Sequence, residues 1–149
     1  MAVERTFAML KPGVLERRLA GEILARIERK GFDLVAAKLM RVTRDLAERH
    51  YAEHRGKAFF VELVDYVTSG PVLAMVLEGD GAVLMLRKLC GSTKAEEAAP
   101  GTIRGDYAMH TGLNIIHASD SAESAAREIG LFFRPEEILA WRDGNEEWI

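Results

Sequence analysis

The chain has 149 residues, 48% of them hydrophobic and four of them proline, which is enough for one compact domain with a sizeable core. Acidic and basic residues are evenly mixed and give a formal net charge of −3, so no basic stripe indicates a nucleic-acid or anionic-membrane partner. No apolar run approaches the roughly 20 residues of a spanning helix, and the N-terminal residues lack the pattern of a secretory leader. We therefore expect a cytoplasmic protein that associates with neither membranes nor nucleic acid.

The elements are predicted from hydrophobic period and turn residues. The first strand ends where Pro12 restricts the residue before it and Gly13 permits a turn. The first helix ends after a basic last turn at Gly31, a glycine C-cap. Thr43 is the expected N-cap of the next helix. In chain order we predict a strand at 5–10, a helix at 20–30, a strand at 32–42, a helix at 43–54, a helix after Gly56, a strand at 72–77, a helix through 83–90, a strand at 114–117 and a final helix.

Residues 92–113 lack a clean period and are rich in glycine and polar groups. A loop of this length inside a compact domain is usually functional. Asp120, with Glu123 three residues later, predicts an aspartate form of the capping box at the start of the final helix. The predicted fold class is α+β with about four strands, in a single domain spanning 1–149 with residues 136–149 as a C-terminal tail.

The spacing of cysteine and histidine residues in the sequence predicts no metal site with protein ligands. Cys90 is the single cysteine, which excludes an intrachain disulfide and a thiolate metal site. Its apolar helical context predicts a buried, inert thiol. His50 and His54 have the i, i+4 spacing that could hold zinc, but no glutamate follows the first histidine as the zinc-protease motif requires.

His117 is the first candidate for chemistry because it stands where a predicted strand gives way to a helix start. On pattern alone, a hydrogen-bonded core histidine is the commoner interpretation. The free N–H groups of the helix start favour an anion nearby, and phosphate is the natural candidate. Lys11, Arg87 and Arg104 could neutralise it, although each alone is more often a solvated surface charge. Glu128, eleven residues after His117, could reach back to the imidazole or lie exposed on its helix.

Five motifs taken together resemble the nucleoside diphosphate kinase family, in register from about Glu4 to Pro135. They are TFAMLKP with ERRLAGEI, HYAEHRGKAFF, TSGP, AAPGTIRGDY and NIIHASDS. No P-loop and no G-x-G-x-x-G competes with them. The resemblance implies a ferredoxin-like βαββαβ core with a four-stranded antiparallel sheet covered by helices, into which a helical pair at 43–68 is inserted. It also implies a homo-oligomer, usually a hexamer and in some bacteria a tetramer.

By this resemblance, His117 takes the γ-phosphoryl group from a nucleoside triphosphate, typically ATP, and passes it to a nucleoside diphosphate in a ping-pong reaction. A free imidazole has a pKa near ~6.5, so at neutral pH it already offers a lone pair. Glu128 matches the glutamate that holds the other ring nitrogen, and Lys11 and Asn114 complete the implied catalytic set. Two alternatives remain: a catalytically silent nucleotide-binding regulatory module, and a nucleic-acid-binding role, against which the acidic balance of charge argues.

The resemblance also implies a nucleotide-binding set with phosphate, sugar and base contacts. Its members are Lys11, Tyr51, Phe59, Leu63, Arg87, Thr93, Arg104 and Asn114. The cations and the hydroxyls of Tyr51 and Thr93 match phosphate contacts, and Asn114 with Lys11 matches the contacts to the sugar. Phe59 matches the aromatic ring on which the base stacks, with Leu63 beside it, and such stacking tolerates every base. The implied cofactor is Mg²⁺, bound mainly through the nucleotide phosphates.

The chain departs from the family pattern at several positions near these motifs. Ala118 replaces the usual glycine after the histidine, Leu113 stands where many members have arginine, and Thr111 where an apolar residue often lines the base site. Gly13-Val14 and Lys94-Ala95 also differ from the common Asp-Gly and Asn-Pro. We expect these changes to affect rate, base preference and loop geometry while every matched catalytic residue is retained.

Overall fold

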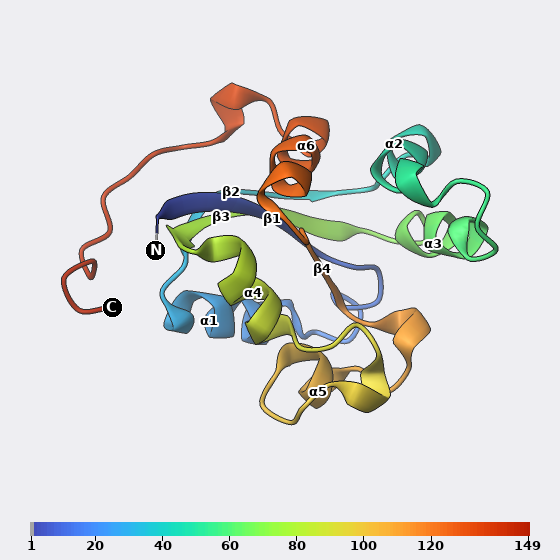
Figure 1. Ribbon diagram of the computed structural model, residues 1–149, viewed down its shortest axis with the longest axis horizontal. Helices are drawn as coiled ribbons and strands as arrows, with labels where there is room; N and C mark the ends of the chain where they lie inside the picture. Colours follow the sequence, from blue (N-terminus) through green and yellow to red (C-terminus); the bar gives the residue numbers. More distant parts are fainter. Residues whose placement is uncertain (1) are drawn as a thin grey trace.

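The computed structural model describes residues 2–149 and contains a four-stranded sheet with helices on both faces (Figure 1). The strands are β1 (Val3–Leu10), β2 (Asp33–Met40), β3 (Val72–Asp80) and β4 (Ile116–Ala118). They lie in the order β2-β3-β1-β4, and each neighbouring pair is antiparallel. The α+β class agrees with the prediction from the sequence pattern, and the ferredoxin-like strand order is the one that the resemblance implied.

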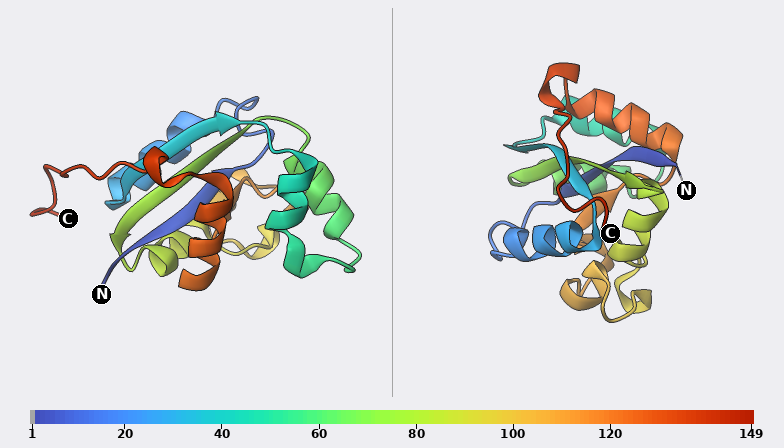
Figure 2. Two further views of the ribbon diagram at one scale, coloured as in Figure 1. Left: turned by 90° about the horizontal axis from the view of Figure 1, so that it is seen from above. Right: turned by 90° about the vertical axis from the view of Figure 1, so that its left-hand side faces the viewer.

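The helices divide between the two faces of this sheet. They are α1 (Ala20–Lys30), α2 (Arg44–His50), α3 (Phe60–Val67), α4 (Ala82–Cys90), α5 (Ile103–Tyr107) and α6 (Ala122–Phe132). α1 and α4 lie on one face, α6 lies on the other, and α2 with α3 stands at one end of the sheet (Figures 1 and 2). The α2–α3 pair is inserted between β2 and β3, as the resemblance implied.

β1 is buried on both of its faces, because its alternate side chains enter two separate apolar cores. Leu10 packs in the core that contains Ile23 of α1 and residues of α4. Phe7 points the other way, into the core that contains Val64 of α3 and Phe132 of α6. The end of β1 is therefore a firm support for the residue that follows it, Lys11.

The short strand predicted at 114–117 instead occupies 116–118, because the backbone turns sharply just before it. Ile115 has a φ of 78°, and the N–H of Ile116 donates to the carbonyl of Asn114 at 2.8 Å, two residues back. A positive φ is strained for a β-branched residue. The Lys11 N–H donates to the Ile115 carbonyl at 2.8 Å and helps to hold the turn.

The predicted capping box at Asp120 is wrong. Ser121 is the N-cap of α6, and its Oγ accepts from the N–H of Ser124 at 3.0 Å. Serine and aspartate cap helices about equally well, so residue type alone did not decide between two adjacent positions. Residues 92–113 also contain more structure than predicted, because α5 begins at the N-cap Thr102, whose Oγ1 accepts from the N–H of Gly105.

The tail at 136–149 runs along the edge strand β2. The N–H of Leu139 donates to the carbonyl of Val35 at 2.8 Å, and the indole N–H of Trp141 donates to the carbonyl of Leu34 at 2.9 Å. Among residues 2–149, no helix combines the length and apolar character needed to cross a membrane.

Gly105 provides a test of how tightly α5 is packed. A Cβ at Gly105 would overlap the carbonyl oxygen of Ala99, a backbone atom, so Gly105→Ala should lower the free energy of unfolding by about 3 kcal/mol or more. Gly21→Ala is the matched control, because Gly21 lies in α1 with open space around it, and there alanine should stabilise by up to about 1 kcal/mol. Urea titration measures both, and equal stability of the two variants would contradict this packing.

Candidate active site

One cavity of about 720 Å³ collects all ten residues singled out from the sequence. It is lined by side chains from the end of β1, from α2 to α4, from the 92–114 segment and from β4 and α6. The ten are Lys11, Tyr51, Phe59, Leu63, Arg87, Thr93, Arg104, Asn114, His117 and Glu128. Residues more than 100 positions apart in the chain thus share one site.

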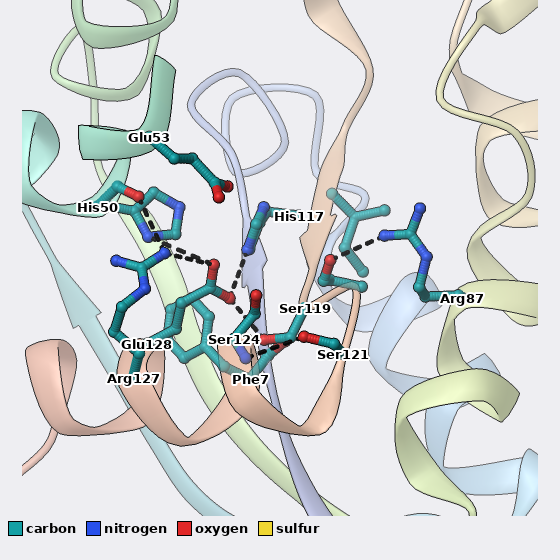
Figure 3. A network of polar contacts seen from close by, with 12 residues as sticks. Phe7, His50, Glu53, Arg87, His117, Ser119, Ser121, Ser124, Arg127 and Glu128 are labelled. Carbon is teal, nitrogen blue, oxygen red and sulfur yellow. Dashed lines mark hydrogen bonds and ion pairs between the residues drawn. The ribbon is translucent and has the colours of Figure 1, made fainter. Parts of the chain in front are cut away.

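His117 and Glu128 form the polar centre of the cavity (Figure 3). His117 lies on β4, where it pairs with Met9 of β1. Its Nε2 is 2.8 Å from Oε1 of Glu128, and the hydroxyl of Ser119 donates to the same oxygen at 2.5 Å. An ionised carboxylate only accepts hydrogen bonds, so Nε2 carries the proton and Nδ1 keeps its lone pair. No described side chain bonds Nδ1, so this nitrogen is available to a ligand in the cavity.

Glu128 is ionised although it is buried. Burial alone would raise the pKa of this carboxyl group. The hydrogen bond from His117, the charge that His117 carries when it is protonated and the hydrogen bond from Ser119 outweigh burial and hold the pKa at about 2. The carboxylate therefore remains charged at any pH at which the protein works, and it fixes both the tautomer and the orientation of the His117 ring.

Lys11 is not the solvated surface charge that its residue type suggests. It is 7% exposed, and its Nζ donates to Oδ1 of Asn114 at 2.7 Å. Burial, and then the charge of Arg104, lower the pKa of Lys11 to about 7. The ammonium group is thus poorly solvated and close to losing its proton, so an anion in the cavity would stabilise it strongly.

Arg104 is also buried rather than solvated, with 5% exposure. Its guanidinium donates to the carbonyls of Gly91, Asn114 and Ile116 at 2.8, 3.2 and 2.6 Å. Arginine has five N–H donors, so three of them hold the loop and the turn while two remain for a ligand. Arg87 is half-buried and donates to the carbonyl of Ala118 at 3.1 Å.

The apolar end of the cavity lies at the start of α3. Phe59 is 44% exposed there, Leu63 lines the wall one turn further on, and the ring of His54 lies 5.3 Å from that of Phe59. Thr111 stands on the opposite segment, where its Oγ1 accepts from the N–H of Ala95. An exposed aromatic face inside a cavity is suited to stacking on a flat ring.

Asp120, on the cavity wall, and His50, beside it, are among the residues near the site that were not singled out from the sequence. Asp120 lines the cavity, whereas we expected it to cap the helix. His50 is buried beside His117, with 4.6 Å between ring centroids and 78° between ring planes. The sequence offered His50 as half of a zinc pair and as the first residue of the motif HYAEHRGKAFF, and the resemblance assigned it no role.

His50, His117 and Glu128 form the one group among residues 2–149 whose spacing resembles a metal site. Their candidate ligand atoms all lie within 4.8 Å of one another. The Nη2 of Arg127 also lies 3.6 Å from Glu128 and would repel a cation. Within this group, His117 and Glu128 are joined by a hydrogen bond, and the nearby arginine disfavours a cation.

Comparison with known proteins identifies the same family throughout. A family model described as nucleoside diphosphate kinase matches residues 4–138. Nucleoside diphosphate kinases from Listeria monocytogenes and Archaeoglobus fulgidus are 57% and 55% identical over 147 residues, which cover 99% of this chain and 100% and 97% of theirs. A solved structure of a halophilic nucleoside diphosphate kinase from Halobacterium salinarum in complex with CDP has a TM-score of 0.96 at 48% identity, covering 99% of this chain and 98% of that one.

The low pKa of Glu128 predicts a pH-dependent contribution to stability. A carboxyl pKa that is lowered on folding stabilises the protein above the unfolded value of 4.5, and this contribution is lost as pH falls through the folded value of about 2. As pH falls between these two values, the free energy of unfolding of the parent should decrease by on the order of 3 kcal/mol more than that of Glu128→Gln. Urea titrations of both proteins from pH 6 to pH 2 test this, and parallel pH profiles would contradict it.

The pKa of Lys11 predicts proton uptake when a nucleotide binds. At pH 7.5 a lysine with a pKa of about 7 is mostly neutral, and a phosphate beside it favours the charged form, so binding of MgADP should draw a proton from solution. Calorimetric titrations in two buffers of different ionisation enthalpy measure this uptake. Lys11→Met should remove it, and uptake of the same size in both proteins would overturn the assignment.

Proposed function

The chain belongs to the nucleoside diphosphate kinase family, and we propose that it transfers the phosphoryl group by a ping-pong reaction through a phosphohistidine at His117. The protein is a phosphotransferase that acts between nucleoside triphosphates and nucleoside diphosphates. One observation carries the proposed mechanism. His117 is held at Nε2 by a buried, ionised Glu128, which leaves Nδ1 free in the cavity.

The reaction divides into two transfers at the same atom. Nδ1 of His117 attacks the γ-phosphorus, the bond between that phosphorus and the bridging oxygen breaks, and the nucleoside diphosphate leaves. A terminal oxygen of a second nucleoside diphosphate then attacks the phosphohistidine, the N–P bond breaks, and His117 recovers its lone pair. Because Nε2 keeps its proton throughout, the ring needs no separate base, and Glu128 stabilises the positive charge that develops on it.

The buried cations supply the electrostatic part of catalysis. Phosphoryl transfer spreads negative charge over the transferred oxygens, and Lys11, Arg87 and Arg104 stand in the same cavity as His117. Lys11 and Arg104 are already desolvated and held by protein oxygens, so little reorganisation is needed when charge develops. Tyr51 and Thr93 provide hydroxyl groups on the same walls. Burial raises the pKa of Tyr51, which therefore remains a donor.

The rest of the nucleotide fits the other end of the cavity. Phe59 offers an exposed ring face for the base, with Leu63 beside it. Asn114 and Lys11 lie between this end and His117 in the proposed pose and contact the sugar hydroxyls. The relative from Halobacterium salinarum was solved in complex with CDP, which supports nucleotide binding by this chain. Stacking depends on ring area rather than on base edges, so we expect broad base preference.

Magnesium is the proposed cofactor, and the residues of the cavity fit it as part of a magnesium nucleotide. Mg²⁺ prefers oxygen ligands and usually retains several waters while it is bound by phosphates and one or two carboxylates. Asp120 is a carboxylate on the cavity wall that could hold such a hydrated ion. Bound magnesium would neutralise charge on the phosphates, while the side chains of this chain orient them.

We further propose that residues 1–149 act as one domain within a cytoplasmic homo-oligomer, a hexamer or a tetramer. Large apolar side chains exposed on the chain support an assembly. They are Val3, Leu39, Phe59, Val61, Leu84, Met109, Leu113, Leu139, Trp141, Trp148 and Ile149. Leu39 lies near the end of the edge strand β2, beyond Leu34 and Val35, whose carbonyls accept from the tail, and this part of the edge could pair with a second copy.

Incubation with MgATP and no acceptor tests the phosphohistidine directly. The parent should gain one acid-labile phosphoryl group by intact mass, and addition of a second nucleoside diphosphate should remove it. His117→Ala should gain none while it remains folded. His110→Asn is the matched control, because His110 is exposed, and it should be phosphorylated like the parent.

Two outcomes would contradict this mechanism. Binding of ATP without phosphorylation of the parent would favour the catalytically silent regulatory module. Phosphorylation that persists in His117→Ala would place the phosphoryl group on another residue.

A further inference from the structure

His50 is the buried polar side chain beside the active site that the proposed mechanism does not use. Its side chain is 1% exposed, and neither ring nitrogen has a hydrogen-bond partner. Most buried polar groups in folded proteins are bonded, so an unpaired imidazole at the end of α2, in contact with the catalytic histidine, requires an explanation.

Four aromatic rings fix the orientation of His50. Its ring meets the rings of Tyr51 and His117 edge-on, with centroids 4.6 Å apart in each case. Phe132 lies 5.4 Å away and Phe7 6.1 Å away, also edge-on. The packed rings prevent the imidazole from turning, so each of its nitrogens keeps a fixed direction.

That direction brings Nδ1 of His50 toward the carboxylate that holds the catalytic histidine. Nδ1 lies 4.0 Å from Oε2 of Glu128, whereas Oε1 accepts from His117 and Ser119 (Figure 3). A neutral imidazole carries one proton. A lone pair on Nδ1 would face the negative oxygen, whereas an N–H bond there is attracted to it, so the geometry favours the tautomer with the proton on Nδ1.

Burial is the main reason that the His50 imidazole stays neutral. Burial, followed by the charge that His117 carries when it is protonated, lowers the pKa of His50 to about 3, although the charge of Glu128 opposes this. Arg127 of α6 and Lys11 after β1 act in the same direction as burial. Arg127 also lies 3.6 Å from Oε2 of Glu128 and donates to the carbonyl of His50 at 3.4 Å.

We propose that His50 is a positioning residue for phosphoryl transfer, because its fixed ring directs an Nδ1–H group at Oε2 of Glu128. The electrostatic attraction across this 4.0 Å separation favours the orientation of the carboxylate in which Oε1 is aligned with Nε2 of His117. The proposal rests on the proposed function, since it assigns His50 a role in orienting the phosphorylated histidine through Glu128. His50 itself does not touch the nucleotide or the transferred group.

Two substitutions separate the N–H group from the shape of the ring. His50→Asn retains an N–H donor at the position of Nδ1, and His50→Phe retains a ring without a donor. In single-turnover reactions with MgATP, phosphohistidine formation should remain within about threefold of the parent rate in His50→Asn and fall about tenfold or more in His50→Phe. The concentration of ATP that gives half the maximal rate should be unchanged, because His50 contributes no nucleotide contact.

The tautomer of His50 in the unsubstituted protein provides a second measurement that does not depend on the folding of a variant. Correlation spectra of the ¹⁵N-labelled imidazole rings should show His50 as neutral with its proton on Nδ1 from pH 5 to pH 8. A proton on Nε2, or titration of His50 within that range, would overturn the proposal. A His50→Phe protein that is phosphorylated as fast as the parent would also overturn it.

The same experiment distinguishes this proposal from the proposed function. If the parent forms no phosphohistidine, the mechanism through His117 fails. If the parent is phosphorylated at His117 and His50→Phe reacts equally fast, the mechanism stands and only the positioning role of His50 is rejected. His110→Asn again serves as the control for loss of an exposed histidine.

Discussion

The hydrogen bond between Glu128 and His117 imposes the main constraint on this structure, because it requires a charged carboxylate inside a folded core. A buried carboxylate is stable only where donors surround it. His117 and Ser119 supply those donors from β4 and the residue after it, while Glu128 comes from the middle of α6. α6 must therefore pack against β4 in one fixed orientation. This packing sets the orientation of the reactive imidazole.

The sheet provides the rigidity that this contact needs. β1 is central and buried on both faces, and it pairs with β4 in a register that places His117 opposite Met9. The backbone N–H of Ser119 continues the pairing by donating to the carbonyl of Phe7 at 3.1 Å. Lys11 extends from the end of the same strand into the cavity. A single well-packed strand thus aligns the nucleophile, one donor to Glu128 and one cation.

Local sequence patterns predicted the elements of this fold but not the details that depend on tertiary contacts. Hydrophobic period was sufficient for the main strands and helices, and Gly31 ends α1 in the left-handed conformation that glycine permits. The turn at Ile115 was missed because distant groups, the Lys11 N–H among them, hold it. Burial of Lys11 was missed for the same reason, since residue type alone indicates a surface charge.

The site was predicted less from physics than from resemblance. Pattern alone left His117 as a core histidine or a phosphate contact, whereas the combined motifs led to ten residues that the structure places in one cavity. His50 escaped both approaches, because its position depends on how α2 packs against β4 and α6. A residue that acts through another side chain has no characteristic sequence spacing from that residue, so a motif search does not find it.

The position of the phosphoryl group on the imidazole tests the central claim most directly. If Glu128 holds Nε2, a protein phosphorylated with MgATP should carry the group on Nδ1 of His117, and ³¹P–¹⁵N NMR of the labelled protein can identify that nitrogen. A phosphoryl group on Nε2 would contradict the account, because the bond between Glu128 and His117 would then have to break before the reaction.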